Sequence, residues 1–156
     1  MKLPLFLFFL CGLAHSSNAQ NNSKEVKAFL DALNKLATTT TQNHWRYEEP
    51  MKADSLFHLN GDTLTVTLKY STDSSWTRVR MAAPFSKIRT IDWDHYLLLN
   101  YHDEDVVRIY EQTNLDPAWK LVQQTDLLHI GAVSEENKKE MKMKEAIEKK
   151  FENLKL

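Results

Sequence analysis

The chain has 156 residues, 42% of them hydrophobic, and its 20 Lys and Arg residues nearly balance its 21 Asp and Glu residues. This balance gives no electrostatic reason to expect a nucleic acid or an anionic membrane as a partner. The sequence has one cysteine, Cys11, so it offers neither a disulfide within the chain nor a cysteine pair for a metal.

The first 19 residues have the pattern of a secretory signal peptide. A single basic residue precedes an apolar run from Leu3 to Ala14, and small residues precede Gln20. The run is too short to cross a membrane, which takes about 20 apolar residues. We therefore expect cleavage after Ala19 and export of the mature chain to the periplasm or the exterior.

Removing residues 1–19 leaves 19 Lys and Arg against 21 Asp and Glu, a net charge of −2, and takes Cys11 away. No integral membrane segment is expected in the remainder, and its length suits a single domain with a sizeable core. A lipoprotein acylated at Cys11 is the alternative. It is disfavoured because the residues before this cysteine, Phe8 to Leu10, are larger than those of a lipobox.

An amphipathic helix is predicted over residues 23–37. Apolar residues recur there at helical spacing: Val26, Phe29, Leu30, Leu33 and Leu36. Asn22 and Glu25 can form a capping box at its start. Four consecutive threonines, residues 38–41, should end it because β-branched side chains lose rotamer freedom in a helix.

The middle of the chain alternates apolar and polar residues with the period of two that is typical of strands. Predicted strands cover Leu56–Leu59, Leu64–Tyr70, Trp76–Met81, Ile88–Trp93, Tyr96–Tyr101 and Val106–Gln112, with Trp119–Gln124 as a seventh. Asn60-Gly61 predicts a tight hairpin turn between the first two strands, because glycine allows a positive φ. Pro84 should end the third, since it has no amide hydrogen.

A second amphipathic helix is predicted at the C-terminus. Ser134 caps it, Glu135 and Glu136 lie in its first turn, and one face carries Met143, Ile147, Phe151 and Leu154. The order helix, six or seven strands, helix predicts one α+β domain over residues 20–156, an antiparallel meander with an amphipathic helix at each end. This order of elements resembles the pleckstrin-homology type of barrel. No motif accompanies the resemblance, so it implies no site residue, and an open sheet covered by helices is the competing arrangement.

No catalytic residue, metal site or cofactor is predicted. The densest polar clusters are Asp92–His95 and His102–Asp105, whose side chains suit Zn, Mn or Ca. In a meander these clusters lie at opposite ends of the sheet, roughly 17–20 Å apart, so we interpret them as turns. The sequence also has no HExxH motif, no GxSxG nucleophile elbow and no glycine-rich phosphate loop.

Trp76, Arg78 and Arg80 form the one pattern with binding character. Their alternation places them on one face of a strand, where an aromatic ring and guanidinium groups can stack on a planar ligand or sugar ring, or anchor a protein. The competing interpretation buries Trp76 under a helix and pairs both arginines with acids. The sequence thus favours a non-enzymatic exported binding or interaction domain for an unidentified small molecule or protein. The alternatives are a small hydrolase or metal-dependent enzyme built from scattered His and Asp residues, and a structural accessory or assembly protein.

Overall fold

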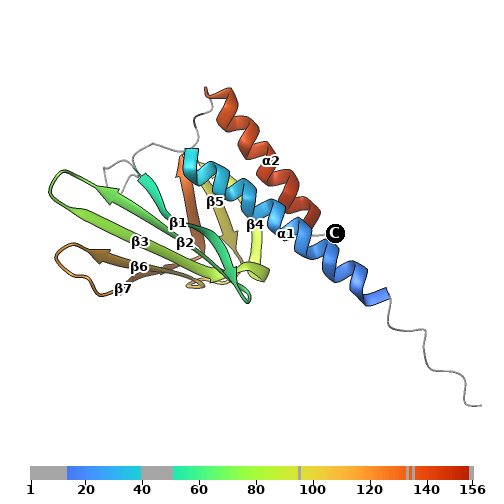
Figure 1. Cartoon of the computed structure of the whole chain (residues 1–156), viewed down its shortest axis with the longest axis horizontal. Helices are drawn as coiled ribbons and strands as arrows, with labels where there is room; N and C mark the ends of the chain where they lie inside the picture. The colour runs from blue at the N-terminus through green and yellow to red at the C-terminus, as the bar shows by residue number, and fades with distance from the viewer. Residues whose placement is uncertain (1–13, 40–50, 95, 133, 135, 155–156) are drawn as a thin grey trace, which may run out of the picture.

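The computed structural model describes residues 14–39, 51–94, 96–132, 134 and 136–154, which form two helices and eight strands (Figure 1). Their bounds are α1 Ala14–Thr39, β1 Met51–Asn60, β2 Thr63–Ser71, β3 Trp76–Pro84, β4 Ile88–Asp94, β5 Tyr96–Tyr101, β6 Val107–Thr113, β7 Lys120–Thr125, β8 Leu127–Ala132 and α2 Lys138–Leu154. A single 3-10 turn, η1, covers Phe85–Lys87. The predicted α+β class, with a helix near each end, is confirmed.

The strands form two antiparallel sheets rather than one meander. The larger has the order β1-β2-β3-β6-β7, and the smaller has the order β4-β5-β8. β4 and β5 leave the first sheet, and β6 then returns to pair with β3. The sheets do not close into a barrel, so the resemblance to the barrel does not extend to closure. The predicted antiparallel strands are divided between two open sheets, with β6 beside β3 rather than beside β5.

The chain changes sheets at a corner held by Asp62 of the β1–β2 turn. β3 ends at Pro84, as predicted, and η1 follows. The backbone oxygen of Asp62 accepts from the Phe85 N–H at 2.6 Å. Its carboxylate accepts from the backbone N–H of Ser86 at 2.9 Å and from the Ser86 hydroxyl at 2.6 Å. These bonds direct the chain away from β3, so β4 begins a different sheet.

The β1–β2 hairpin is confirmed, but its turn lies one residue later than predicted. Asn60 pairs with Thr63, so the two central residues are Gly61 and Asp62. Gly61 has a φ of +59°, the region that glycine enters without steric cost. Asn60 is therefore the last residue of β1 rather than part of the turn, and its side chain projects from the sheet.

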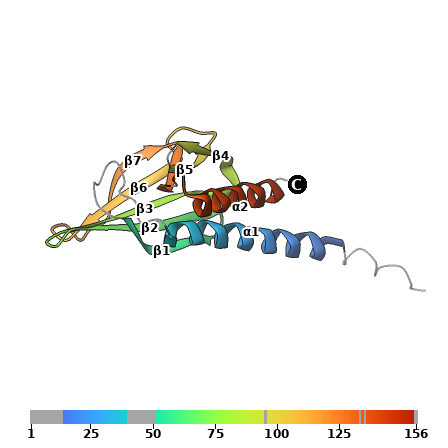
Figure 2. The same ribbon diagram turned by 90° about the horizontal axis from the view of Figure 1, so that it is seen from above.

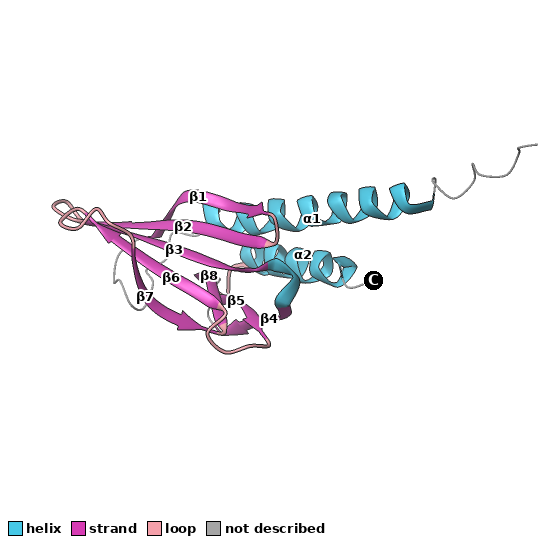
Figure 3. Ribbon diagram, turned by 90° about the horizontal axis from the view of Figure 1, so that it is seen from below, coloured by secondary structure: helices cyan, strands magenta, loops and turns pink. Residues whose placement is uncertain are grey.

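α1 and α2 lie side by side (Figures 2 and 3). α1 contacts both β1 and β8, which are edge strands of different sheets. The ring centroid of Phe29 on α1 lies 5.7 Å from that of Phe151 on α2 and 6.0 Å from that of Phe85. Phe29, Leu33 and Ile147 are fully buried, so the helices supply much of the core.

α1 is longer than the predicted helix at its N-terminal end. It begins at Ala14 and passes through the predicted cleavage position after Ala19 in this uncleaved chain, while residues 1–13, with Cys11, lie outside the described residues. Asn22 is inside α1, so the predicted capping box does not form. Within the described part of the chain, neither helix is long and apolar enough to cross a bilayer.

The ends of the helices are set by side chains that bond to the backbone. At the C-terminal end of α1 the Thr38 hydroxyl donates to the Asn34 oxygen at 2.8 Å. α2 begins at Lys138 rather than near Ser134, because Asn137 is the cap: its Oδ1 accepts from the amides of Lys139 and Glu140, at 3.1 and 3.4 Å. Glu136 thus precedes the helix, and Glu135 lies outside the described residues.

The eighth strand is the element that the sequence analysis missed. β8 pairs with β5 and contributes the fully buried Leu128. The cluster His102–Asp105 forms a turn after β5, as predicted. Asp92 and Asp94 are instead residues of β4, so the turn interpretation of the first cluster was wrong for these two residues. His95 lies outside the described residues, and no group of three or more His, Cys, Asp or Glu side chains that could hold a metal occurs among those described.

Candidate binding groove

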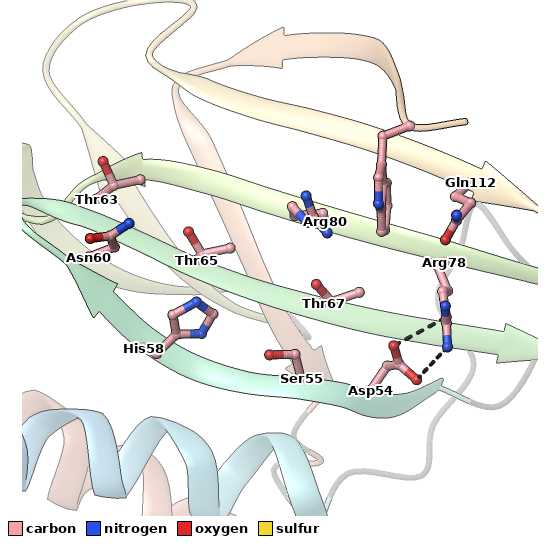
Figure 4. A pocket seen from close by; sticks show the side chains of 11 residues that line it. Asp54, Ser55, His58, Asn60, Thr63, Thr65, Thr67, Arg78, Arg80 and Gln112 are labelled. Carbon is pink, nitrogen blue, oxygen red and sulfur yellow. Dashed lines mark hydrogen bonds and ion pairs between the residues drawn. The ribbon is translucent and has the colours of Figure 1, made fainter. Parts of the chain in front are cut away.

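β2 directs its side chains alternately to the two faces of the five-stranded sheet. On the inner face they are core residues: Leu64, Val66, Leu68 and Tyr70. On the outer face they are threonines that line a hollow: Thr63, Thr65 and Thr67 (Figure 4). This division follows from the period of two in a strand, which separates the apolar from the polar residues of β2.

The hollow, which we call the groove, has a volume of about 540 Å³. Beside the threonines of β2, its lining consists of Asp54, Ser55, His58 and Asn60 from β1, Arg78 and Arg80 from β3, Gln112 from β6, and Trp119 from the segment before β7. The volume lies within the range of roughly 300–1,000 Å³ that small-molecule sites occupy. Five segments of the outer face thus converge on one polar site.

Two irregularities in β1 shape one wall of the groove. The register with β2 shifts between Ala53 and Ser55 and again between Ser55 and His58. Each shift places an extra residue in β1, and such bulges bend a strand and re-aim its side chains. As a result Asp54 and Ser55, although neighbours in the chain, both line the groove.

Arg78 is held by a carboxylate. Its Nη2 donates to Oδ1 of Asp54 at 3.4 Å, and its Nε lies 3.1 Å from Oδ2 without hydrogen-bond alignment (Figure 4). The guanidinium carbon also lies 5.2 Å from the centroid of the Trp76 ring. The carboxylate of Asp54 therefore largely balances the charge of Arg78.

Arg80 is held differently. Its guanidinium carbon lies 4.0 Å from the centroid of the Trp119 ring, within the range of a cation–π contact. Within the described part of the chain, no carboxylate forms an ion pair with Arg80. Stacking restrains the guanidinium plane but leaves its N–H groups, which lie in that plane, available for hydrogen bonds.

The floor of the groove carries polar groups without protein partners. Among the described residues, no hydrogen bond engages the side chains of Ser55, Asn60, Thr63, Thr65 and Thr67. Thr67 is only 5% exposed. The Oε1 atom of Gln112 is buried and has no partner among the described residues, while its Nε2 donates to the Pro117 oxygen. Polar groups placed in this way favour a polar occupant, because unpaired groups that lose water cost free energy.

The hydroxyl groups of the lining are not hydrogen-bonded to a base among the described residues. A serine or threonine nucleophile needs a base within hydrogen-bond reach. His58 instead uses Nδ1 for a 2.9 Å contact with the Leu56 oxygen, and Asp54 faces Arg78. Within the described residues, neither group forms a hydrogen bond with a hydroxyl of the groove.

The structure places the predicted residues Trp76, Arg78 and Arg80 on the outer face of β3, away from both helices. The two arginines line the groove, whereas Trp76 lies beside it and contacts Arg78 and Lys69. The competing burial of Trp76 under a helix is wrong. Arg78 has an acidic partner, whereas Arg80 has none among the residues that the structure describes.

The sequence analysis missed the threonines and Trp119 as site residues. The alternation in β2 already placed Thr63, Thr65 and Thr67 on one face, which was the available signal. Nothing local to Trp119 indicated its contact with Arg80, because that contact depends on how β6 and β7 return to the first sheet.

Comparisons with protein-family models, with curated proteins and with solved structures gave no match.

Proposed function

We propose that this chain is an exported, non-enzymatic binding domain whose groove takes a polar small molecule. The observation that carries the proposal is a hollow of about 540 Å³ in which five uncharged polar side chains and the stacked Arg80 have no polar partner among the described residues. Export rests on the signal-peptide pattern of residues 1–19.

The alternatives receive less support from these observations. A hydrolase would need an activated nucleophile. Among the described groove residues, no hydroxyl is hydrogen-bonded to His58 or Asp54. An accessory or assembly protein would use an exposed apolar surface, whereas the groove, which is built from five segments, is polar.

The test compares two variants that add the same side chain. Thr65→Tyr fills the floor of the groove, and Ser71→Tyr adds a tyrosine at the exposed end of the same strand. The mature protein and both variants are titrated with fractions of a polar metabolite and saccharide extract, and binding is followed by the NMR signals of threonine methyls and tryptophan indoles. Circular dichroism verifies that the variants are folded.

We expect one or more fractions to shift the signals of groove residues in the mature protein and in Ser71→Tyr but not in Thr65→Tyr. If no fraction shifts these signals, or if Thr65→Tyr binds as the unaltered protein does, the groove is not the binding site.

A further inference from the structure

The two arginines of the groove differ in what they leave available to a ligand. Arg78 faces Asp54 at 3.1 Å, so it brings little free charge. Arg80 rests on the Trp119 ring at 4.0 Å and has no carboxylate among the described residues. A stacked guanidinium keeps its planar fork of N–H donors, which matches the geometry of an oxyanion.

The charge of the groove has the sign opposite to that of the whole chain. Its charged groups are Arg78, Arg80 and Asp54, a net charge of +1 with His58 neutral, while the full chain has a net charge of −1. A concave surface with low-dielectric walls concentrates such a field. The groove is therefore complementary to an anion.

The remaining lining requires more than a charge from the ligand. Hydroxyls line the floor at Thr65 and Thr67, and within the described part of the chain no hydrogen bond engages either of them. A fatty acid would leave these groups unpaired, which costs free energy. A bare inorganic anion would leave most of the volume unfilled. A ring that carries several hydroxyl groups supplies both donors and acceptors.

Taking the groove to be a binding site, as proposed above, we infer that its ligand is an acidic saccharide: a hydroxylated ring whose oxyanion is held by Arg80 on Trp119. The hydroxyl groups of the ring lie over the threonine floor and pair with the hydroxyls of Thr65 and Thr67. The oxyanion can be a carboxylate, as in a uronic acid, or a phosphate ester, and both use the same guanidinium fork.

The experiment measures dissociation constants by calorimetry for three matched panels. These are uronic-acid disaccharides, the corresponding neutral disaccharides and monosaccharide phosphates. The proteins are the mature chain, Arg80→Gln, which removes the free charge, and Arg108→Gln. Arg108 is an exposed arginine on β6 of the same sheet, outside the groove lining.

We expect at least one acidic panel to bind the mature protein more tightly than the neutral panel. Arg80→Gln should weaken that binding by about tenfold or more, as loss of a charged hydrogen-bonding partner does, and Arg108→Gln should leave it unchanged. Preference for the uronic-acid or the phosphate panel then identifies the oxyanion.

Two results would overturn the inference. If neutral disaccharides bind as tightly as acidic ones and Arg80→Gln changes nothing, the groove still binds a polar ligand but does not select an oxyanion. If neither acidic panel binds, the acidic saccharide is wrong, and the extract titration with Thr65→Tyr decides separately whether the groove binds anything.

Discussion

The contact between Asn34 of α1 and Phe57 of β1 leads to a specific stability prediction. β1 is an edge strand, so its outward backbone groups have no neighbouring strand. The side chain of Asn34 takes that place: its Oδ1 accepts from the Phe57 N–H at 2.6 Å, and its Nδ2 donates to the Phe57 oxygen at 3.0 Å. One amide side chain thus pairs with both backbone groups of a strand residue.

Replacing Asn34 with leucine should destabilise the fold by about 2 kcal/mol. Each hydrogen bond contributes about 1 kcal/mol net, and partly buried groups left without a partner add to the loss, giving about 2–3 kcal/mol. Leucine is the better helix former by about 0.5 kcal/mol, which offsets part of that loss. The side chains of asparagine and leucine are similar in size, so packing contributes little.

The free energy of unfolding is measured by urea denaturation, and hydrogen exchange follows the Phe57 amide. Asn153→Leu is the control, because Asn153 is exposed on α2 and such changes usually stay within about 0.5 kcal/mol. We expect the Asn34→Leu variant to lose stability and to exchange the Phe57 amide faster. A loss no larger than that of the control, with unchanged exchange at Phe57, would refute the role assigned to Asn34.

Three further predictions concern the core, the pH dependence and export. Phe151→Ala should cost about 3–5 kcal/mol in urea denaturation, because the ring is buried against Phe29; a loss under about 1 kcal/mol would mean that α2 is not part of the cooperative unit. Burial lowers the pKa of His129, so the unfolded chain binds more protons and stability should fall as pH drops below about 6.5. His129→Gln should reduce that slope between pH 7.5 and 5.5, and an unchanged slope would assign the effect to other groups. The intact mass of the exported protein should correspond to a chain that begins at Gln20, whereas a lipid adduct on Cys11 would contradict the signal-peptide assignment.

The local pattern of the sequence was sufficient for most elements but not for their pairing. The alternation along β2 placed Leu64 and Thr65 on opposite faces of the sheet. The alternation along β3 likewise placed Arg78 and Arg80 on one face. No local signal showed that β6 returns to β3, because the corner that diverts β4 depends on Asp62, which lies 24 residues before Ser86. The start of α2 was misplaced because Ser134 and Asn137 are both of capping type and Asn137 is the one that caps the helix. α1 instead continues N-terminally past Asn22 to Ala14.

The pairing of strands decides the site, because the groove combines residues that are far apart in sequence. Thr67 of β2 lies between Ser55 of β1 and Arg80 of β3 in register, and the ring under Arg80 comes from beyond β6. The same strands supply the core on their opposite face. Variants of outward residues such as Arg80 should therefore change binding with little effect on stability. Thr67 is the exception, because at 5% exposure it belongs to both the groove and the packed sheet.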